Sequence, residues 1–346
     1  MGRLYYPYVM GTDSPIPNLF EGITKFVADS GFEITTLTNS CDPIVKHPQV
    51  NEYYAMSSGS MLRRLQYVRL AMGKYNLVHT GGQAHYNMSR LLHARNRNLR
   101  HLHTFRVDVN SEMFPQDRKR KLLEFADRVS AVSEHTARTV KEVFDVDPVV
   151  IYNAVDTGKF RPDYPCPPTL TKLNSERPIF IFVGNFVDRK RPADVVKVAK
   201  RVSSAQFLMF GDGPLFPSIA ESAQRLDNLT LFGRINKSTL PAIYSNSTGL
   251  LFPSVREGCP NVVLEAMASG TPVIGYRATS MPELITDGET GYLSQPTDVE
   301  GLVAGIRSLL ATDRENMRQK ARTYTVNNHT FEQIADNYLD VYNNML

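Results

Sequence analysis

The second half of the chain alternates short β-branched or aromatic runs with amphipathic segments, and this alternation constrains the fold more than any other feature. A buried strand is expected at residues 178–183, and Pro192 stands where a first helical residue would, ahead of apolar residues at helical spacing. Further strands are expected at residues 206–210, 228–232 and 249–252, with one helix ending near Arg225 and another beginning near Ser238. This succession predicts a parallel sheet with crossover helices.

The first half of the chain repeats the pattern. Strands are expected near residues 4–9, 33–37, 76–80, 100–105, 128–132 and 149–152, and residues 61–72 are expected to be helical. A group of prolines then disfavours both helix and sheet interior, namely Pro162, Pro165, Pro167, Pro168 and Pro178. A length of 346 residues also suits two ordinary domains.

We therefore expect an α/β protein of two doubly wound, Rossmann-like domains that face a central cleft. Residues 1–157 would form the N-terminal domain, 158–177 the linker and 178–328 the C-terminal domain, and residues 329–346 would form a closing helix that packs back toward the N-terminal domain. Ligands of such sheets bind at the carboxyl ends of the strands, so the cleft is the expected site.

Composition excludes several other classes of protein. With 42% hydrophobic and 21% charged residues, the chain differs from disordered and coiled-coil proteins. No apolar run approaches the roughly 20 residues of a spanning helix, and no cleavable signal is recognised. The three cysteines, Cys41, Cys166 and Cys259, lack the spacing of a disulfide framework or a zinc cluster. We expect a cytoplasmic protein.

Positive charge is concentrated in residues 61–121, which carry 13 Lys and Arg against three acidic residues. Five of the eight histidines also lie there. This basic window predicts a surface for an anionic partner, with a solvated helix face as the alternative. Nucleic acid is disfavoured because no nucleic-acid-binding motif accompanies the charge.

Residues 257–270 give the strongest indication of a functional site, because Glu257 and Glu265 stand eight apart across a Gly-Pro loop. Glu265 is expected about one turn into the following helix. Unpaired backbone amides at a helix start suit a phosphate or sugar hydroxyls. A carboxylate such as Glu265 can accept two hydrogen bonds from the vicinal diol of a ribose. The alternative is a glutamate satisfied by local donors at the helix end.

This segment resembles the Glu-x7-Glu signature of the retaining glycosyltransferases of family 4, which have the GT-B fold. Residues 182–190 resemble the Gly-Arg-x4-Lys loop of the family. Shorter matches follow in the family's order at residues 130–133, 152–156, 210–214, 231–234, 252–254, 271–274, 282–283 and 287–291. The resemblance is specific over residues 128–295 and holds in outline elsewhere.

The resemblance implies a role for each matching residue. Glu265 would bind the nucleotide ribose, Glu257 would face the donor sugar, and Lys190 would neutralise the diphosphate. The catalytic candidates are Glu257, Lys190 and Arg106. The donor-binding candidates are Gly184, Asn185, Lys190, Phe232, Gly233, Glu257, Gly258, Cys259, Pro260, Asn261, Val262 and Glu265. The acceptor-side candidates are Gly11, Thr12, Asp13 and Arg106. No metal or other cofactor is expected, because no Asp-x-Asp motif of the metal-dependent class is recognised and Lys190 with helix amides can stabilise the leaving charge.

Two replacements depart from the family pattern in charge. Asn185 stands where the family has an arginine on the diphosphate, and Arg189 or Arg191 could supply the missing charge. Arg106 stands where a cleft histidine is usual, and the spacing of His103 places it on the other side of the strand.

Two loops depart from the family pattern in their glycines. Residues 11–13 lack the usual glycine pair, and Thr279-Ser280 stands where two glycines are common. Loop geometry near the donor sugar is therefore expected to differ.

The resemblance and the basic window together predict a retaining transferase that moves a hexose-type sugar from a nucleotide sugar to an acceptor hydroxyl. A UDP-sugar is favoured and a GDP-sugar is second, for glycolipid, glycan or polysaccharide synthesis. The basic window suggests an anionic or lipid-linked acceptor and peripheral contact with the inner face of a membrane. Two alternatives stay open, a GT-B nucleotide-sugar epimerase and a catalytically degenerate nucleotide-sugar-binding subunit. A nicotinamide dehydrogenase is disfavoured because neither half shows G-x-G-x-x-G after its first strand.

Overall fold

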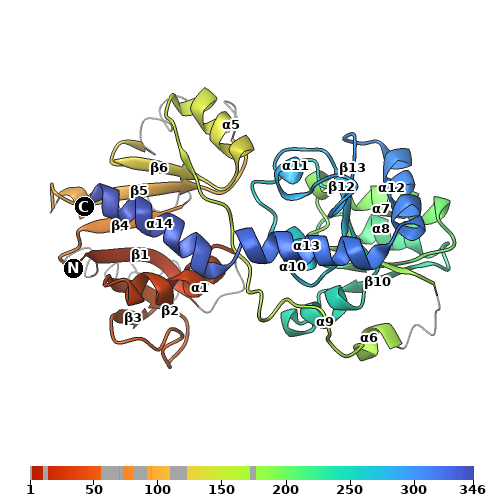
Figure 1. The fold of residues 1–346 in the computed structure, drawn as a ribbon, viewed down its shortest axis with the longest axis horizontal. Coiled ribbons are helices and arrows are strands. Elements are labelled where there is room, and N and C mark those ends of the chain that lie inside the picture. Colours follow the sequence, from red (N-terminus) through yellow and green to blue (C-terminus); the bar gives the residue numbers. More distant parts are fainter. Residues whose placement is uncertain are drawn as a thin grey trace. The chain divides into compact units, whose positions relative to one another are not determined.

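The computed structural model describes residues 2–10, 15–55, 70, 73–81, 92–94, 96–109, 123–171 and 177–346 (Figure 1). The chain divides into two compact units. Unit 1 comprises residues 1–154 and 331–346, and unit 2 comprises residues 155–330. The first segment of unit 1 ends at residue 154, three residues before the expected end of the N-terminal domain at residue 157. The described part of the expected linker belongs to unit 2.

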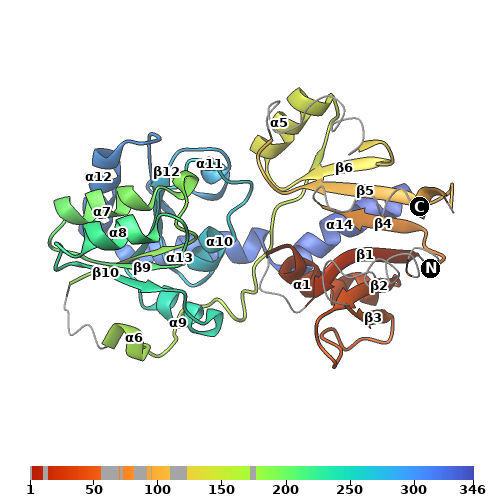
Figure 2. The ribbon, with the colours of Figure 1, turned by 180° about the vertical axis from the view of Figure 1, so that it is seen from behind.

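Unit 1 is built on a parallel sheet whose described strands follow the order β3-β2-β1-β4-β5-β6-β7 (Figure 2). The strands are β1 (Arg3–Met10), β2 (Glu33–Thr38), β3 (Val50–Tyr54), β4 (Leu77–Thr80), β5 (Arg100–Phe105), β6 (Arg128–Ala131) and β7 (Val149–Val150). The helices discussed below are α1 (Pro15–Asp29), α5 (Glu134–Phe144) and α14 (Phe331–Met345). The sequence did not predict β3, because Val-Asn-Glu-Tyr-Tyr lacks apolar alternation and lies at a sheet edge with both tyrosines exposed. The helix expected at 61–72 lies outside the described residues except for Leu70.

The C-terminal helix α14 packs on α1 within unit 1. Its apolar face, with Ile334, Tyr338 and Tyr342, is fully buried. The Tyr342 hydroxyl lies 2.6 Å from His79 Nδ1 and 3.1 Å from the Tyr6 hydroxyl. Because buried polar groups need partners, these contacts fix the helix against the sheet.

Unit 2 is built on a second parallel sheet, with the described strands in the order β10-β9-β8-β11-β12-β13. The strands are β8 (Ile179–Val183), β9 (Gln206–Phe210), β10 (Leu229–Gly233), β11 (Gly249–Phe252), β12 (Val273–Tyr276) and β13 (Gly291–Ser294). The helices are α6 (Pro168–Thr171), α7 (Pro192–Arg201), α8 (Phe216–Ala223), α9 (Leu240–Ser245), α10 (Asn261–Ala268), α11 (Met281–Leu284), α12 (Val299–Ala311) and α13 (Arg314–Asn328), with short 3-10 turns at η2 (Asp188–Lys190) and η3 (Lys237–Thr239). In the described parts of both units, no helix has the length and hydropathy required to cross a membrane.

Strands β8 and β11 are neighbours in the middle of this sheet. The chain runs outward from β8 through β9 to β10, and then returns to form β11 on the other side of β8. Such a reversal creates a switch point, where the loops at the carboxyl ends of two adjacent strands diverge and leave room for a ligand. The loops that follow β8 and β11 are residues 184–191 and 253–260.

Candidate functional site

The loops after β8 and β11 are joined by contacts to one carbonyl oxygen. The Val255 amide donates to the Arg189 carbonyl oxygen at 2.9 Å, and the Ser254 hydroxyl oxygen lies 3.1 Å from the same atom. These contacts hold the turn that carries Arg189 and Lys190 against the loop that leads to Glu257. The candidate site therefore lies at the switch point of the sheet in unit 2.

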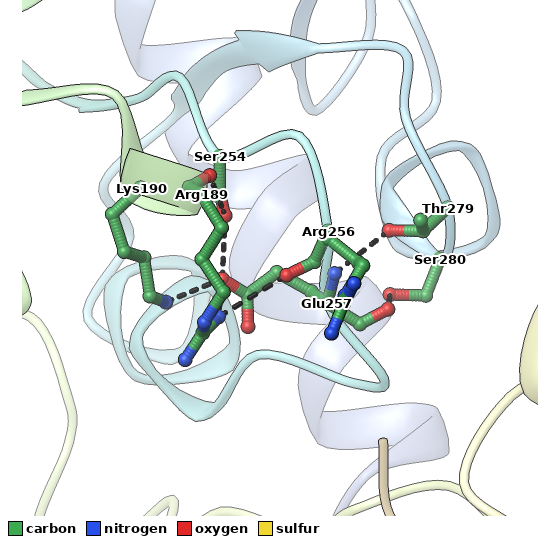
Figure 3. Close-up of polar contacts among 7 residues, drawn as sticks. All are labelled: Arg189, Lys190, Ser254, Arg256, Glu257, Thr279 and Ser280. Carbon is green, nitrogen blue, oxygen red and sulfur yellow. Dashed lines mark hydrogen bonds and ion pairs between the residues drawn. The ribbon is translucent and has the colours of Figure 1, made fainter. Parts of the chain in front are cut away.

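The Glu257 carboxylate is the centre of this site (Figure 3). Its Oε1 atom lies 2.5 Å from Lys190 Nζ, 2.6 Å from the Ser254 hydroxyl and 3.0 Å from Arg189 Nη1. The side chain is only 10% exposed. All three side-chain donors thus converge on one oxygen, and within the described residues Oε2 makes no such bond.

The main chain of Glu257 is held by the segment between β12 and α11. Its amide donates to Thr279 Oγ1 at 3.0 Å, and the Ser280 hydroxyl donates to its carbonyl oxygen at 3.4 Å. Thr279 adopts a left-handed conformation with φ of 48°, which favours glycine. Hydroxyl side chains therefore support Glu257 where the family usually has two glycines.

Lys190 is a buried cation. Its side chain is 11% exposed, and Nζ lies 4.4 Å from the centre of the Phe252 ring. Burial lowers the pKa of this ammonium group, whereas the charge and hydrogen bond of Glu257 raise it in part. A further anion at this position would favour the charged form of the lysine.

Glu265 lies one turn into α10, as expected from the sequence. The hydroxyl of Tyr244, a fully buried residue of α9, donates to Glu265 Oε2 at 3.1 Å. Burial raises the pKa of the Glu265 carboxyl, and this hydrogen bond opposes the rise. The local partner is thus a tyrosine from the preceding helix rather than a donor at the end of α10.

The glycine candidates lie at adjacent strand ends. The Gly184 amide donates to the Phe210 carbonyl oxygen at 3.0 Å, and the Gly211 amide donates to the Gly233 carbonyl oxygen at 2.8 Å. A Cβ at Gly211, where φ is 133°, would lie 1.9 Å from the Gly184 carbonyl oxygen. The Phe232 ring stacks on Phe210 with centroids 5.0 Å apart. The carboxyl ends of β8 and β9 therefore approach each other closely only because a glycine stands at position 211.

The remaining donor-side candidates lead into α10. Gly258 and Cys259 lie in the loop, and the Cys259 side chain is buried. Pro260 is the N-cap of α10, so Asn261 and Val262 are its first two residues. Only residues 258–260 therefore separate Glu257 from the start of α10.

Arg106 belongs to unit 1 and follows the end of β5. Its Nη1 donates to Asn153 Oδ1 at 3.0 Å, and its guanidinium lies 5.3 Å from the centre of the Phe20 ring. His103 is buried and lies 2.9 Å from the Thr80 hydroxyl. The acceptor-side candidates Gly11, Thr12 and Asp13 lie outside the described residues, as does most of the basic window 61–121.

An Asp-x-Asp triplet does occur in the chain, at residues 145–147. Asp145 is the left-handed C-cap of α5, and Asp147 Oδ1 lies 2.6 Å from Lys141 Nζ. This triplet therefore ends a helix of unit 1. Within the described residues, no group of three or more His, Cys, Asp and Glu side chains is arranged to hold a metal ion.

Sequence reasoning did not identify Tyr244, and it singled out Thr279 and Ser280 only as a departure from the glycines of the family, without their contacts to Glu257. Ser254 was part of a recognised motif, but its contact with Glu257 was not predicted. Tyr244 and Thr279 reach their partners across 21 and 22 residues of chain. A single sequence gives no signal for contacts of that separation.

Two family models match this chain over adjacent segments. The model for Glycosyltransferase Family 4 matches residues 23–159, and the model for Glycosyl transferases group 1 matches residues 170–325. Together they cover most of the chain.

Relatives with curated descriptions are similar over part of their length. N-acetyl-alpha-D-glucosaminyl L-malate synthase of Bacillus anthracis is 30% identical over 241 residues, which is 65% of this chain and 61% of that protein. GDP-mannose-dependent alpha-(1-6)-phosphatidylinositol monomannoside mannosyltransferase of Mycolicibacterium smegmatis is 26% identical over 60% of this chain and 59% of its own. The chain thus spans about three fifths of these relatives.

Among solved structures, HepE of Anabaena in complex with UDP-glucose is similar over 99% of this chain and 100% of its own, with a TM-score of 0.79 and 16% identity. At this identity the likeness shows the fold, which is the GT-B fold of two parallel-sheet domains.

Proposed function

The models for Glycosyltransferase Family 4 and Glycosyl transferases group 1 match residues 23–159 and 170–325, so this chain belongs to the family 4 glycosyltransferases, and we propose that it is a retaining glycosyltransferase. It would move a hexose-type sugar from a nucleotide sugar to an acceptor hydroxyl. The observation that carries the proposal is the Glu257 site at the switch point of unit 2, where two cations and a hydroxyl meet on one carboxylate oxygen.

In this proposal the donor nucleotide binds along the carboxyl ends of the strands in unit 2. Glu265 accepts hydrogen bonds from the ribose hydroxyls, Lys190 neutralises the diphosphate, and Glu257 Oε2 accepts a hydroxyl of the donor sugar. The base lies beside Phe232 and Gly233, and the backbone of Gly184 and of residues 258–262 approaches the phosphates and the sugar. The structure of HepE with UDP-glucose favours a UDP-sugar, whereas the GDP-mannose-dependent relative makes a GDP-sugar the second choice.

The chemical step needs charge stabilisation on the leaving group. The bond from the anomeric carbon to the diphosphate oxygen breaks, and a bond from the same carbon to the acceptor oxygen forms on the same face. The proton of the acceptor hydroxyl passes to the departing phosphate. Glu257 pairs with two cations, Arg189 and Lys190, which lowers the nucleophilicity of the carboxylate and favours the front-face route over a covalent intermediate. Lys190 and the amides at the start of α10 supply the stabilisation without a metal ion.

The acceptor would bind to unit 1, on the side that carries Arg106. We propose an anionic or lipid-linked acceptor because of the basic window at residues 61–121. The relative N-acetyl-alpha-D-glucosaminyl L-malate synthase, whose name includes the dicarboxylate L-malate, supports an anionic acceptor. Peripheral contact with an anionic membrane at its cytoplasmic face follows from the same charge, and sedimentation with phosphatidylglycerol vesicles at low salt tests it. A protein that stays in the supernatant would contradict this contact.

A thermal-shift screen with UDP, GDP, ADP, CMP and their common sugar conjugates, with and without Mg²⁺, tests the donor site. We expect one nucleotide family to raise the melting temperature independently of Mg²⁺, and we expect Glu265→Ala to abolish the shift. Glu142→Ala, an exposed glutamate of α5 in unit 1, is the control and should keep it. If no nucleotide shifts the wild-type protein, the proposed function is wrong.

Product analysis separates the proposal from its alternatives. A transferase releases the nucleoside diphosphate and glycosylates an added acceptor. An epimerase forms product from the donor alone, without an acceptor. A degenerate subunit binds the nucleotide sugar but neither hydrolyses nor transfers it.

A further inference from the structure

Two arginines flank the buried lysine of the site, and they have different environments. The position that the family fills with an arginine is here Asn185, whose side chain is exposed at the start of the loop after β8. A nucleoside diphosphate carries at least two negative charges, so Lys190 alone would leave part of that charge unbalanced. Arg189 and Arg191 are the nearest cations in the sequence, and the structure distinguishes between them.

Arg191 is committed to a buried carboxylate. Its Nε donates to Asp194 Oδ2 at 2.8 Å and its Nη2 to Asp194 Oδ1 at 3.4 Å. Asp194 is fully buried and also binds Lys197 Nζ at 2.8 Å and the Tyr276 hydroxyl at 2.9 Å. Movement of Arg191 toward a ligand would leave this buried charge with fewer partners, which is unfavourable. Arg191 therefore serves the start of α7.

Arg189 lies on the side of Glu257. Its Nη1 donates to Glu257 Oε1 at 3.0 Å and to the Arg256 carbonyl oxygen at 3.1 Å. Its side chain is 45% exposed. Within the described residues all of its side-chain hydrogen bonds are made by Nη1, so Nε and Nη2 can donate to a ligand. Arginine presents such donors in a planar fork that matches two phosphate oxygens.

Arg189 and Lys190 converge on the same point (Figure 3). Because both bind Glu257 Oε1, at 3.0 and 2.5 Å, Arg189 Nη1 and Lys190 Nζ are no more than about 5.5 Å apart. One carboxylate balances only one of these two charges. The pair thus carries a surplus positive charge at the switch point, where an anionic ligand would be bound.

We propose that Arg189 supplies the second cation of the diphosphate site and so stands in for the arginine that Asn185 replaces. This inference rests on the proposed function. Nη1 stays on Glu257 while Nε and Nη2 donate to the diphosphate oxygens, so the arginine links the phosphate-binding turn to the carboxylate that faces the sugar.

Calorimetric titration of Arg189→Gln tests this assignment. The probes are UDP, GDP and ADP, each compared with UMP, GMP and AMP. We expect Arg189→Gln to weaken binding of the diphosphate by about 10- to 100-fold, the range of a charge-assisted hydrogen bond, and to change binding of the monophosphate little. Arg201→Gln is the matched control, because Arg201 is 44% exposed, pairs with Glu300 and lies at the far end of α7.

A second variant tests whether a cation at position 185 can replace the cation at position 189. Asn185→Arg in the Arg189→Gln background should recover binding of the diphosphate, because it restores a cation at the family position. A loss that this change does not recover would overturn this replacement.

Three results would overturn the assignment, and they are distinguishable. Wild-type binding of the diphosphate by Arg189→Gln would show that this arginine does not contact it. Equal losses for diphosphate and monophosphate would indicate a general effect on the site. Failure of the wild-type protein to bind any of the three diphosphates would reject the proposed function itself, and the inference with it.

Discussion

Two carboxylates of unit 2 have the same kinds of partner and different surroundings. Each binds an arginine, a lysine and a hydroxyl group. The partners of Asp194 are Arg191, Lys197 and Tyr276, and those of Glu257 are Arg189, Lys190 and Ser254. Asp194 is fully buried and uses both oxygens, whereas Glu257 is slightly exposed and accepts all three donors on Oε1.

This difference shows how one set of residue types can stabilise a fold or bind a ligand. At Asp194 the two cations are the more exposed partners, so the charge of the carboxylate is balanced within the protein. At Glu257 it is the lysine that is buried, and within the described part of the chain Oε2 and part of the Arg189 guanidinium make no hydrogen bond. We therefore propose that Asp194 serves stability and Glu257 the donor site, and the following variants test that division.

The largest effect is expected for Lys190→Ala on turnover. Loss of one preorganised donor to a leaving group commonly costs about 10²–10³ in rate. The measurement is release of nucleoside diphosphate from the nucleotide sugar in the presence of acceptor. Lys200→Ala, which removes an exposed lysine of α7, is the control. Equal turnover in the two variants would remove Lys190 from the mechanism.

Asp194→Asn should affect stability rather than chemistry. Loss of the buried charge leaves the Tyr276 hydroxyl and two cations with a weaker partner, and we expect the free energy of unfolding to fall on the order of 3 kcal/mol. Urea denaturation measures this change, and Asp227→Asn, at a residue that is 79% exposed, should be nearly neutral. A similar loss in both variants would contradict the role of burial.

Tyr244→Phe should change the pH dependence of nucleotide binding. Burial raises the pKa of Glu265, and the Tyr244 hydrogen bond lowers it, so removal of the hydroxyl should raise this pKa further. Only the ionised carboxylate accepts two ribose hydroxyls, so UDP affinity falls when the carboxylate is protonated. As the pH is lowered, this fall should begin at a higher pH in the variant than in the wild type, and the two affinities should differ by up to about tenfold near the midpoint. Tyr292→Phe, whose hydroxyl pairs with Thr312, is the control. Superimposable pH profiles would show that Tyr244 does not act through Glu265.

The smallest effect is a loss of stability in acid that depends on Asp194. Burial alone would raise the pKa of this carboxyl, but hydrogen bonds from Arg191, Lys197 and Tyr276 together lower it below its usual value. A lowered native pKa stabilises the protein above the unfolded value of about 4, and the contribution is lost as the pH falls through the native pKa. The stability difference between the wild type and Asp194→Asn should therefore be constant from about pH 8 to 5 and shrink below about pH 4. A difference that grows in acid would have the wrong sign.

The sequence predicted the elements of the fold with strong patterns. β8 reads Ile-Phe-Ile-Phe-Val and is buried along most of its length, which is typical of the middle of a parallel sheet. Pro192 does begin α7. The edge strand β3 was missed because its exposed tyrosines break the apolar pattern.

The sequence also singled out Glu257, Lys190 and Glu265 as candidates, but it could not choose between Arg189 and Arg191. The choice depends on backbone geometry, because Arg191 adopts a left-handed conformation with φ of 51° as the chain turns into α7. That turn directs one arginine to Asp194 and the other to Glu257. Two arginines separated by one residue carry no signal of this difference in a single sequence.

A crystal structure of the protein with the nucleoside diphosphate chosen by the screen tests the central claim most directly. We predict diphosphate oxygens within about 3.2 Å of Lys190 Nζ and of an Arg189 nitrogen, with the Arg191–Asp194 pair unchanged. A nucleotide bound away from the β8 and β11 loops, or a diphosphate held by Arg191 in place of Arg189, would contradict the account.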